Sequence, residues 1–172
     1  MKNIIKAIAA TVVIAGFANT SFAQATATAS ASANIITPIS IVKTIDMNFG
    51  NVAVSSSIAG TVVLAPGGGR TTGGAGGVTL PSTIGTVSAA SFTVSGQASY
   101  TYAITLPSTC SISDGTHTMT VNTFTSNPSA TGTLSSGGVQ TLTVGATLNV
   151  SAGQAANAYT NATGVPVIVN YN

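Results

Sequence analysis

The sequence predicts an all-β protein, built as an antiparallel β-sandwich with an extended N-terminal segment. Apolar and polar residues alternate along several stretches, most regularly through residues 141–150. Gly, Pro, Asn and Ser interrupt these stretches at short intervals, and beyond residue 23 no helical periodicity lasts longer than two turns. Alternation of period two places one face of a strand on a core and the other face in solvent. Many short strands with frequent turns are typical of an immunoglobulin-like sandwich.

Residues 1–23 have the pattern of a secretory signal peptide. Lys2 and Lys6 form a positive n-region, residues 7–17 form a short apolar h-region, and residues 21–23 (Ser-Phe-Ala) resemble a cleavage site. We expect cleavage after residue 23 and export through the inner membrane to the periplasm, and then to the cell surface or an extracellular fibre. A soluble amphipathic helix and a retained membrane anchor are less favoured, because the h-region is short and has no recurring polar face.

Residues 24–34 form a low-complexity extension of Ala, Thr and Ser. Alanine occupies every odd position from 25 to 33, and Ile35, Ile39 and Ile41 continue the same parity. If it is fully extended, this segment has one apolar edge. Two interpretations stay open: a mobile tail that leads into the first core strand, or a donor strand of residues 25–41 that pairs with another molecule through the three isoleucines.

Residues 35–172 are expected to form a single β-sandwich domain, since their number suits one compact unit. Strands are predicted wherever the alternation recurs. These segments are residues 92–94, 99–106, 119–121 and 141–150, and a C-terminal core strand that contains Val165, Val167, Val169 and Tyr171.

The charge of the predicted mature chain excludes several classes of partner. Lys43 and Arg70 stand against Asp46 and Asp114, so two positive and two negative charges give a formal net charge of zero. Two isolated cations cannot neutralise a nucleic-acid backbone, so no nucleic-acid partner is expected. After signal cleavage no apolar run approaches the roughly 20 residues that span a bilayer. Near-zero net charge also permits self-association.

Few side chains of the predicted mature chain could perform chemistry. His117 is the single histidine, Cys110 has no second cysteine to pair with, and Asp46 and Asp114 are far apart in the sequence. Such a set does not make a metal-binding shell. The Gly-rich residues 66–77 lack the spacing of a phosphate-binding loop, so we expect a flexible connection there. The sequence therefore predicts a protein that is not an enzyme and binds no cofactor or metal.

Several sequence blocks along the chain resemble a known family. They are Phe49-Gly50, Gly60-Thr61-Val62, Gly76-Gly77-Val78, residues 90–96, residues 102–107, residues 142–148, Tyr159 and residues 167–172. Together they are similar to the small exported bacterial proteins called domain of unknown function 4402. This resemblance implies an envelope or surface protein of a Gram-negative cell, and it brings no catalytic residues.

A second, weaker similarity is to fimbrial or pilus subunits and to spore-coat subunits. Pilus subunits assembled by a chaperone and an usher tend to end on an alternating apolar strand with a penultimate aromatic residue. The C-terminal residues Val165, Val167, Val169 and Tyr171 resemble this pattern. The chain departs from that pattern because it lacks a disulfide and a glycine at the expected spacing. The similarity implies a homo-polymer, a periplasmic chaperone and an outer-membrane usher as partners.

Two functions follow as expectations. The first is an exported structural subunit of a bacterial surface fibre or coat, which self-assembles by strand complementation. The second is a monomeric, adhesin-like binding module at the cell surface. The module is less favoured because the chain has no Trp, and because Tyr100, Tyr102 and Tyr171 occupy alternating strand positions that indicate core residues rather than a sugar-binding platform.

Overall fold

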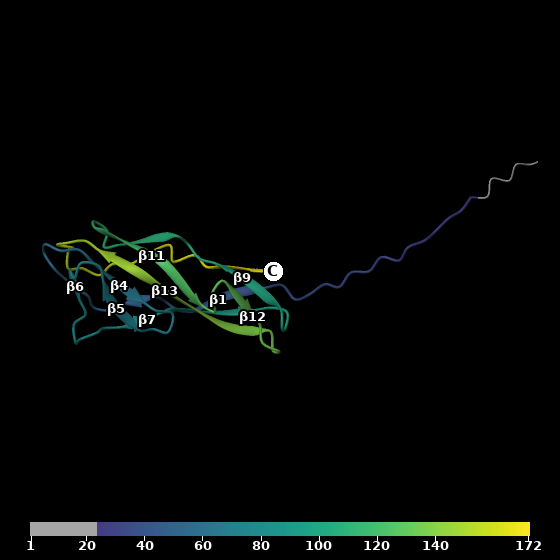
Figure 1. The fold of residues 1–172 in the computed structure, drawn as a ribbon, viewed down its shortest axis with the longest axis horizontal. Coiled ribbons are helices and arrows are strands. Elements are labelled where there is room, and N and C mark those ends of the chain that lie inside the picture. The colour runs from purple at the N-terminus through teal and green to yellow at the C-terminus, as the bar shows by residue number, and fades with distance from the viewer. Residues whose placement is uncertain (1–23) are drawn as a thin grey trace, which may run out of the picture. The chain divides into compact units, whose positions relative to one another are not determined.

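The computed structural model describes residues 24–172 and shows the predicted all-β protein (Figure 1). Within this range no helix is long and apolar enough to cross a membrane. The predicted signal peptide, residues 1–23, lies outside the described residues. The chain divides into two units, of which the second, compact unit begins at Ile36. Residues 24–39 form neither helix nor strand.

All strands of the described residues belong to the compact unit. They are β1 (Ser40–Ile45), β2 (Asn48–Phe49), β3 (Ala53–Val54), β4 (Gly60–Leu64), β5 (Arg70–Gly73), β6 (Val78–Thr79), β7 (Val87–Ser88), β8 (Ala90–Ser95), β9 (Thr101–Thr105), β10 (Thr109–Ser113), β11 (Thr118–Asn127), β12 (Thr131–Thr133), β13 (Val139–Val150) and β14 (Ile168–Tyr171).

The long strand β13 lies at the centre of a seven-stranded antiparallel sheet. The order in this sheet is β1-β8-β13-β11-β10, and β4 and β5 extend it beside the second half of β13. Residues 139–144 pair with β8 and residues 146–150 pair with β4, so β8 and β4 lie end to end along one edge of β13. The other sheets are smaller: a three-stranded sheet, β12-β9-β14, and the ladders β2-β7 and β3-β6.

Two apolar clusters fill the space between the layers, and β13 contributes to both. Its even-numbered side chains from Leu142 to Val150 are buried, as the alternation of this stretch predicts. Cluster 1 consists of Phe49, Val62, Leu64, Val78, Val121, Ala146, Leu148 and Val150. Cluster 2 consists of Ala90, Phe92, Val94, Tyr102, Leu134, Leu142, Val144 and Val169.

The two clusters meet at the middle of β13. Gly145 lies there, where the chain that leaves β4 passes so close that a Cβ on Gly145 would collide with the carbonyl oxygen of Leu64. On the opposite side, β11 carries a bulge between Asn122 and Thr125. Phe124, inside the bulge, packs against both clusters. The bulge and the glycine thus allow the single strand β13 to contribute side chains to both clusters.

The termini of the compact unit meet beside cluster 2. The Tyr171 hydroxyl donates to the Thr37 carbonyl oxygen at 2.7 Å and accepts from the Gln97 amide at 2.6 Å. Gln97 in turn accepts from the Thr37 amide through its side-chain oxygen at 3.2 Å. Three hydrogen bonds therefore fix the point at which the chain enters the compact unit.

Two expectations drawn from local sequence were wrong. The Gly-rich residues 66–77 contain β5, which pairs with β4, because the Arg70 guanidinium binds the carbonyl oxygens of Phe49, Asn51 and Ile84 at 2.5, 2.8 and 3.2 Å and holds the strand in place. Tyr100 is not a core residue. It is 43 % exposed and packs edge-on against the Tyr171 ring, because β9 begins one residue later.

The close approach at Gly145 gives a direct test of the fold. We expect Gly145→Ala to lower the free energy of unfolding by about 2–3 kcal/mol, since backbone must move to admit the methyl group. Gly137→Ala is the matched control: its Cβ would meet only the Ser135 hydroxyl, at 3.7 Å. The control should change stability by less than about 0.5 kcal/mol in urea unfolding. Equal stabilities of the two variants would contradict the close approach of the Leu64 carbonyl oxygen to Gly145.

Candidate docking groove

The structure places the three predicted donor isoleucines in different environments. Ile41 lies in β1, where it pairs with Val94 of β8, and both Ile39 and Ile41 pack against cluster 2 of their own chain. Ile35 is 95 % exposed and belongs to no strand. Two of the three predicted anchors therefore serve the fold of their own subunit in this structure, and the uncommitted part of the N-terminal segment ends at Ile35.

The predicted C-terminal core strand is shorter than its apolar pattern. β14 begins at Ile168, and Val165 and Val167 precede it with half-buried side chains. Val169 is buried, and Tyr171 is half-buried at the junction with Thr37. The strand pairs with β9 rather than with the large sheet.

The described residues enclose a groove of about 1270 Å³. Its floor is the inner face of the large sheet, with side chains such as Phe92, Cys110, Val121, Leu148 and Val150. Residues 45–54 form one wall and residues 154–161 form the other. Most of the floor belongs to cluster 1, so the groove exposes part of the core of the compact unit.

The groove is open because the layer that covers cluster 1 is incomplete. On one side this layer has only two-residue strands, in the ladders β2-β7 and β3-β6. On the other side, residues 151–167 pass over the sheet as coil. They are fastened by a bridge between Thr160 and Ser113 and by a hydrogen bond of 2.9 Å from the Gly153 amide to the Ser55 carbonyl oxygen. No strand of the described residues lies between the two walls.

The first wall has a backbone edge that no strand of residues 24–172 pairs. The amides of Asn51 and Ser55 donate to the carbonyl oxygens of Ile84 and Gly77, each at 2.8 Å, so these two N–H groups point away from the groove. In an antiparallel ladder consecutive residues point to opposite edges. Val54 pairs with Val78 in the β3–β6 ladder next to the bonded Ser55, so its own N–H and C=O groups point to the opposite edge, toward the groove that it lines. We infer the same facing for Val52, which lies two residues earlier and also lines the groove. Such an edge is a template for another strand.

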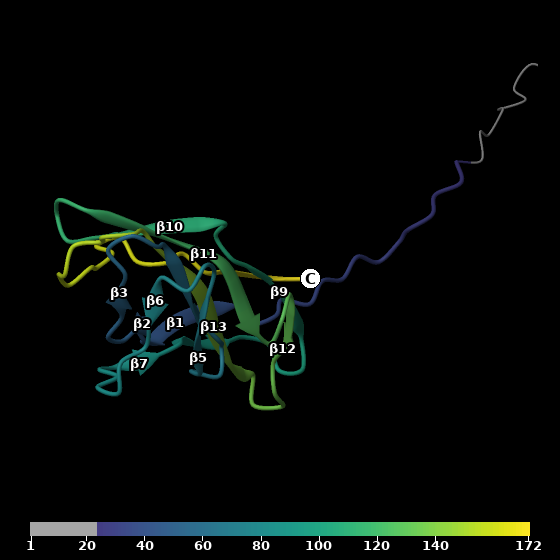
Figure 2. The same cartoon turned by 60° about the vertical axis from the view of Figure 1, so that its left-hand side comes forward.

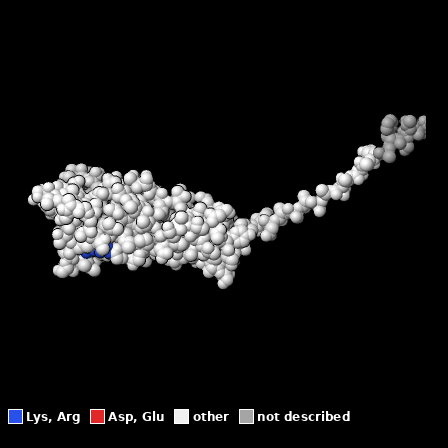
Figure 3. Space-filling model, viewed as in Figure 1, with Lys and Arg blue, Asp and Glu red and all other residues white. Residues whose placement is uncertain are grey.

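The groove carries no net charge. Lys43 and Asp46 are its only charged lining residues, and they bind each other at 2.6 Å with exposed side chains. The face of the molecule in Figure 3 is likewise almost free of charge. An occupant would therefore meet an apolar floor between uncharged walls, and it would gain little from charges of its own.

A polar cluster holds the second wall in place. The Asp114 carboxylate accepts from the backbone amides of Thr116 and His117 at 2.8 and 2.6 Å, from the His117 ring at 3.0 Å and from the Asn157 amide side chain at 2.7 Å. Only 4 % of its side chain is exposed. The backbone and ring of His117, followed by Thr116 and Asn157, hold the pKa of Asp114 well below its usual range. The β10–β11 turn is thus tied to residues 154–161.

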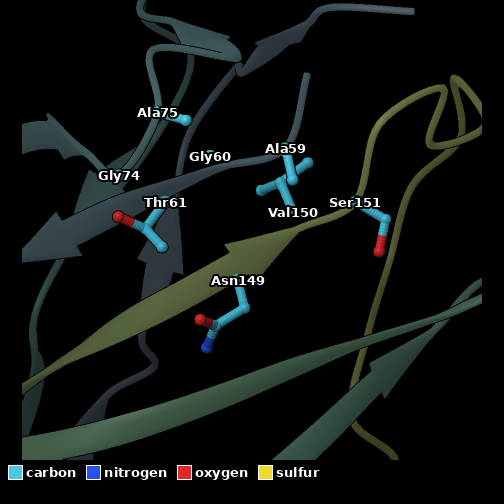
Figure 4. Close-up of a pocket in the computed structure, with 8 residues that line it drawn as sticks. All are labelled: Ala59, Gly60, Thr61, Gly74, Ala75, Asn149, Val150 and Ser151. Atoms are coloured by element: carbon cyan, nitrogen blue, oxygen red, sulfur yellow. The ribbon is translucent and has the colours of Figure 1, made fainter. Parts of the chain in front are cut away.

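The other candidate residues do not come together as a chemical site. In residues 24–172 no three His, Cys, Asp or Glu side chains gather where they could hold a metal ion. Burial raises the pKa of the Cys110 thiol, although a hydrogen bond with Asn161 acts in the opposite direction. A smaller hollow of about 330 Å³ lies where β4 meets the end of β13 (Figure 4), and its lining has no titratable side chain.

Comparison with known families matches residues 39–171 to the family described as Domain of unknown function (DUF4402). The chain belongs to this family. The DUF4402 match begins one residue before β1 and ends on the last residue of β14, so it covers the sandwich and leaves residues 24–38 outside. Comparisons with curated proteins and with solved structures gave no match.

Sequence reasoning missed the groove and its edge residues Val52 and Val54. Two features of the sequence accompany it, although neither locates it. Residues 47–54 keep an apolar character but are broken by Gly50 and Asn51, and residues 151–164 show no alternation at all. A segment in which apolar and polar residues do not alternate is a poor candidate for a strand that covers cluster 1.

The Asp114 cluster predicts a pH dependence that one substitution should remove. A carboxyl group whose pKa is depressed in the folded state adds stability above its unfolded pKa, and that stability is lost as the pH falls. We expect the free energy of unfolding of residues 24–172 to fall between about pH 5 and pH 2, and Asp114→Asn to flatten this decline. Asp46→Asn removes the same charge from an exposed pair and should leave the decline intact. Urea unfolding across this pH range would contradict the assignment if both variants behaved alike.

Proposed function

We propose that this protein is an exported structural subunit of a bacterial surface fibre or coat, and that its subunits join by strand complementation. The observation that supports this most is a match between two parts of one chain. The compact unit has an apolar groove with an unpaired backbone edge, and residues 24–35 are an extended, uncharged segment with apolar side chains at alternate positions. Each part supplies what the other lacks.

Strand complementation suits these parts energetically. Main-chain hydrogen bonds to the groove edge supply affinity, and alternate side chains that enter the groove supply specificity. Burial of one isoleucine contributes about 1.5–3 kcal/mol, whereas each alanine adds only a methyl group at roughly 0.8 kcal/mol. Ile35 is therefore the main anchor of this segment, and the alanine tract adds many small contacts.

The route to the surface forms part of the proposal. The predicted signal peptide would take the chain through the inner membrane to the periplasm. An apolar groove that is open before assembly invites non-specific association. We therefore propose a periplasmic chaperone that covers the groove and an outer-membrane usher that releases each subunit to the growing homo-polymer.

The adhesin-like alternative makes a different prediction about the groove. A monomeric binding module would fill it with a ligand from outside and would not need residues 24–35. The groove floor is mainly aliphatic, with Val121 and Leu148 as typical members, and it suits an extended peptide better than a polar sugar. Oligomeric state therefore separates the two functions.

The proposed function is tested by placing one negative charge at residue 35 or at its neighbour, residue 34. In the mature chain, Ile35→Asp removes the anchor, and we expect subunit association to weaken by about 2 kcal/mol, or roughly 30-fold. Asn34→Asp introduces the same charge at the neighbouring position of opposite parity and should assemble like the wild type. Light scattering after size exclusion, with negative-stain microscopy, gives both readouts.

Ile35 is exposed, so neither variant should alter the melting temperature of the compact unit. A wild-type chain that stays monomeric at high concentration, or an Ile35→Asp chain that still forms filaments, would contradict the proposal.

A further inference from the structure

We propose that the groove receives residues 25–35 of a second copy of this chain, in a head-to-tail arrangement, with the odd-numbered side chains on the floor beside Cys110 and the backbone paired to Val52 and Val54. This inference rests on the proposed function and names the acceptor site, the donor residues and their facing. Four features of the described residues support it.

The first feature is that the groove lies away from the point where residues 25–35 join the compact unit. β13 begins beside Ser95, two residues before Gln97, which binds Thr37 at the entry to the compact unit. The same strand ends at Val150, on the groove floor. In Figures 1 and 2, β9 and β12 mark the first end of the compact unit and β6 lies toward the other, where Figure 2 also labels β3. The chain therefore enters the compact unit at one end, while the groove lies toward the other.

A segment that starts at one end and docks at the other end of a neighbour makes a heterologous contact. Such a contact uses two different surfaces of each subunit, so every added subunit presents a new free groove. The result is a ring or an open filament rather than a closed pair. This geometry favours a second copy over the same chain as the source of the donor.

The second feature is the register available at the groove edge. Val52 and Val54 each present one N–H and one C=O toward the groove, two residues apart. An incoming strand can pair with both while its own side chains alternate between floor and solvent. Its small odd-numbered side chains allow the donor backbone to approach the floor closely.

The third feature is the polarity of the donor. The positions from 26 to 34 of even number are Thr28, Ser30 and similar polar residues, and the odd positions from 25 to 33 are all alanine. Placing the odd set on the floor buries methyl groups and leaves hydroxyl and amide groups in water. A shift of one residue would reverse this arrangement and bury the hydroxyl groups without partners.

The fourth feature is charge. The segment from 24 to 35 has no charged residue, and the groove has only the Lys43–Asp46 pair at its lining. No ion would need to lose its hydration on docking. The uncharged segment therefore suits a groove whose lining has no net charge.

This arrangement can be tested by disulfide cross-linking to Cys110, because Cys110 lies on the groove floor and is the only cysteine of the chain. Donor copies carry Cys110→Ser together with one new cysteine, at an odd position (Ala29→Cys, Ala31→Cys or Ala33→Cys) or at an even position (Ser30→Cys or Ser32→Cys). Acceptor copies keep Cys110, carry a distinct tag, and carry Ile35→Asp so that they donate poorly. The two are mixed, oxidised and separated on non-reducing gels.

We expect disulfides between donor and acceptor copies to form from at least one odd position, and from even positions about tenfold less, because a disulfide requires close and correctly directed Cβ atoms. A second pair of acceptor variants tests the backbone edge. Val52→Pro removes an N–H that faces the groove, whereas Thr72→Pro removes one at the free edge of β5, outside the groove. Val52→Pro should suppress the odd-position disulfide, and Thr72→Pro should leave it intact. Circular dichroism melting confirms that each variant is folded, and the odd–even comparison decides the facing if Val52→Pro does not fold.

The other possible results of the cross-linking experiment would each contradict a different part of the proposal. Equal yields from odd and even positions would overturn the facing. A chain with both Ala31→Cys and Cys110 that forms its disulfide only within itself would overturn the second copy as donor. Filaments without any disulfide to Cys110 would overturn the acceptor site while leaving the proposed function in place. A wild-type chain with neither filaments nor cross-links would overturn both.

Discussion

The burial of one face of β13 is the constraint on which the rest of the structure depends. Its side chains from Leu142 to Val150 are buried at every even position and join two apolar clusters along a single strand. A strand of this length needs partners along both edges, and it obtains them from β8 and β4 end to end on one side and from β11 on the other. Gly145 and the β11 bulge make room where these partners change.

The two halves of β13 are covered to different extents, and the groove follows from that difference. Over cluster 2, the sheet β12-β9-β14 forms a full second layer, and Tyr102 and Val169 close the core. Over cluster 1, short strands and coil leave part of the floor open. The Asp114 cluster and the Thr160–Ser113 bridge hold the coil in position without filling the gap. The layer over cluster 1 is thus incomplete at one end of the compact unit, and the proposed function supplies a strand there.

The sequence predicted the features that depend on local pattern. Alternation through residues 141–150 identified the central strand and its buried face, because burial on one side enforces period two. It could not identify the groove, because an unfilled layer depends on which distant segments fail to meet. It also could not assign Ile39 and Ile41, since an apolar edge pairs equally well with its own sheet or with another chain's. Strand β5 escaped prediction because it depends on Arg70 reaching carbonyl oxygens on two other loops.

Hydrogen exchange of the groove edge tests the missing-strand account most directly. In monomeric Ile35→Asp protein, the amides of Val52 and Val54 should exchange quickly, because they face an open groove. In assembled wild-type protein both amides should become protected, while the amide of Thr72 at the free edge of β5 continues to exchange at its monomeric rate. Protection of Val52 and Val54 that is unchanged by assembly would contradict the account.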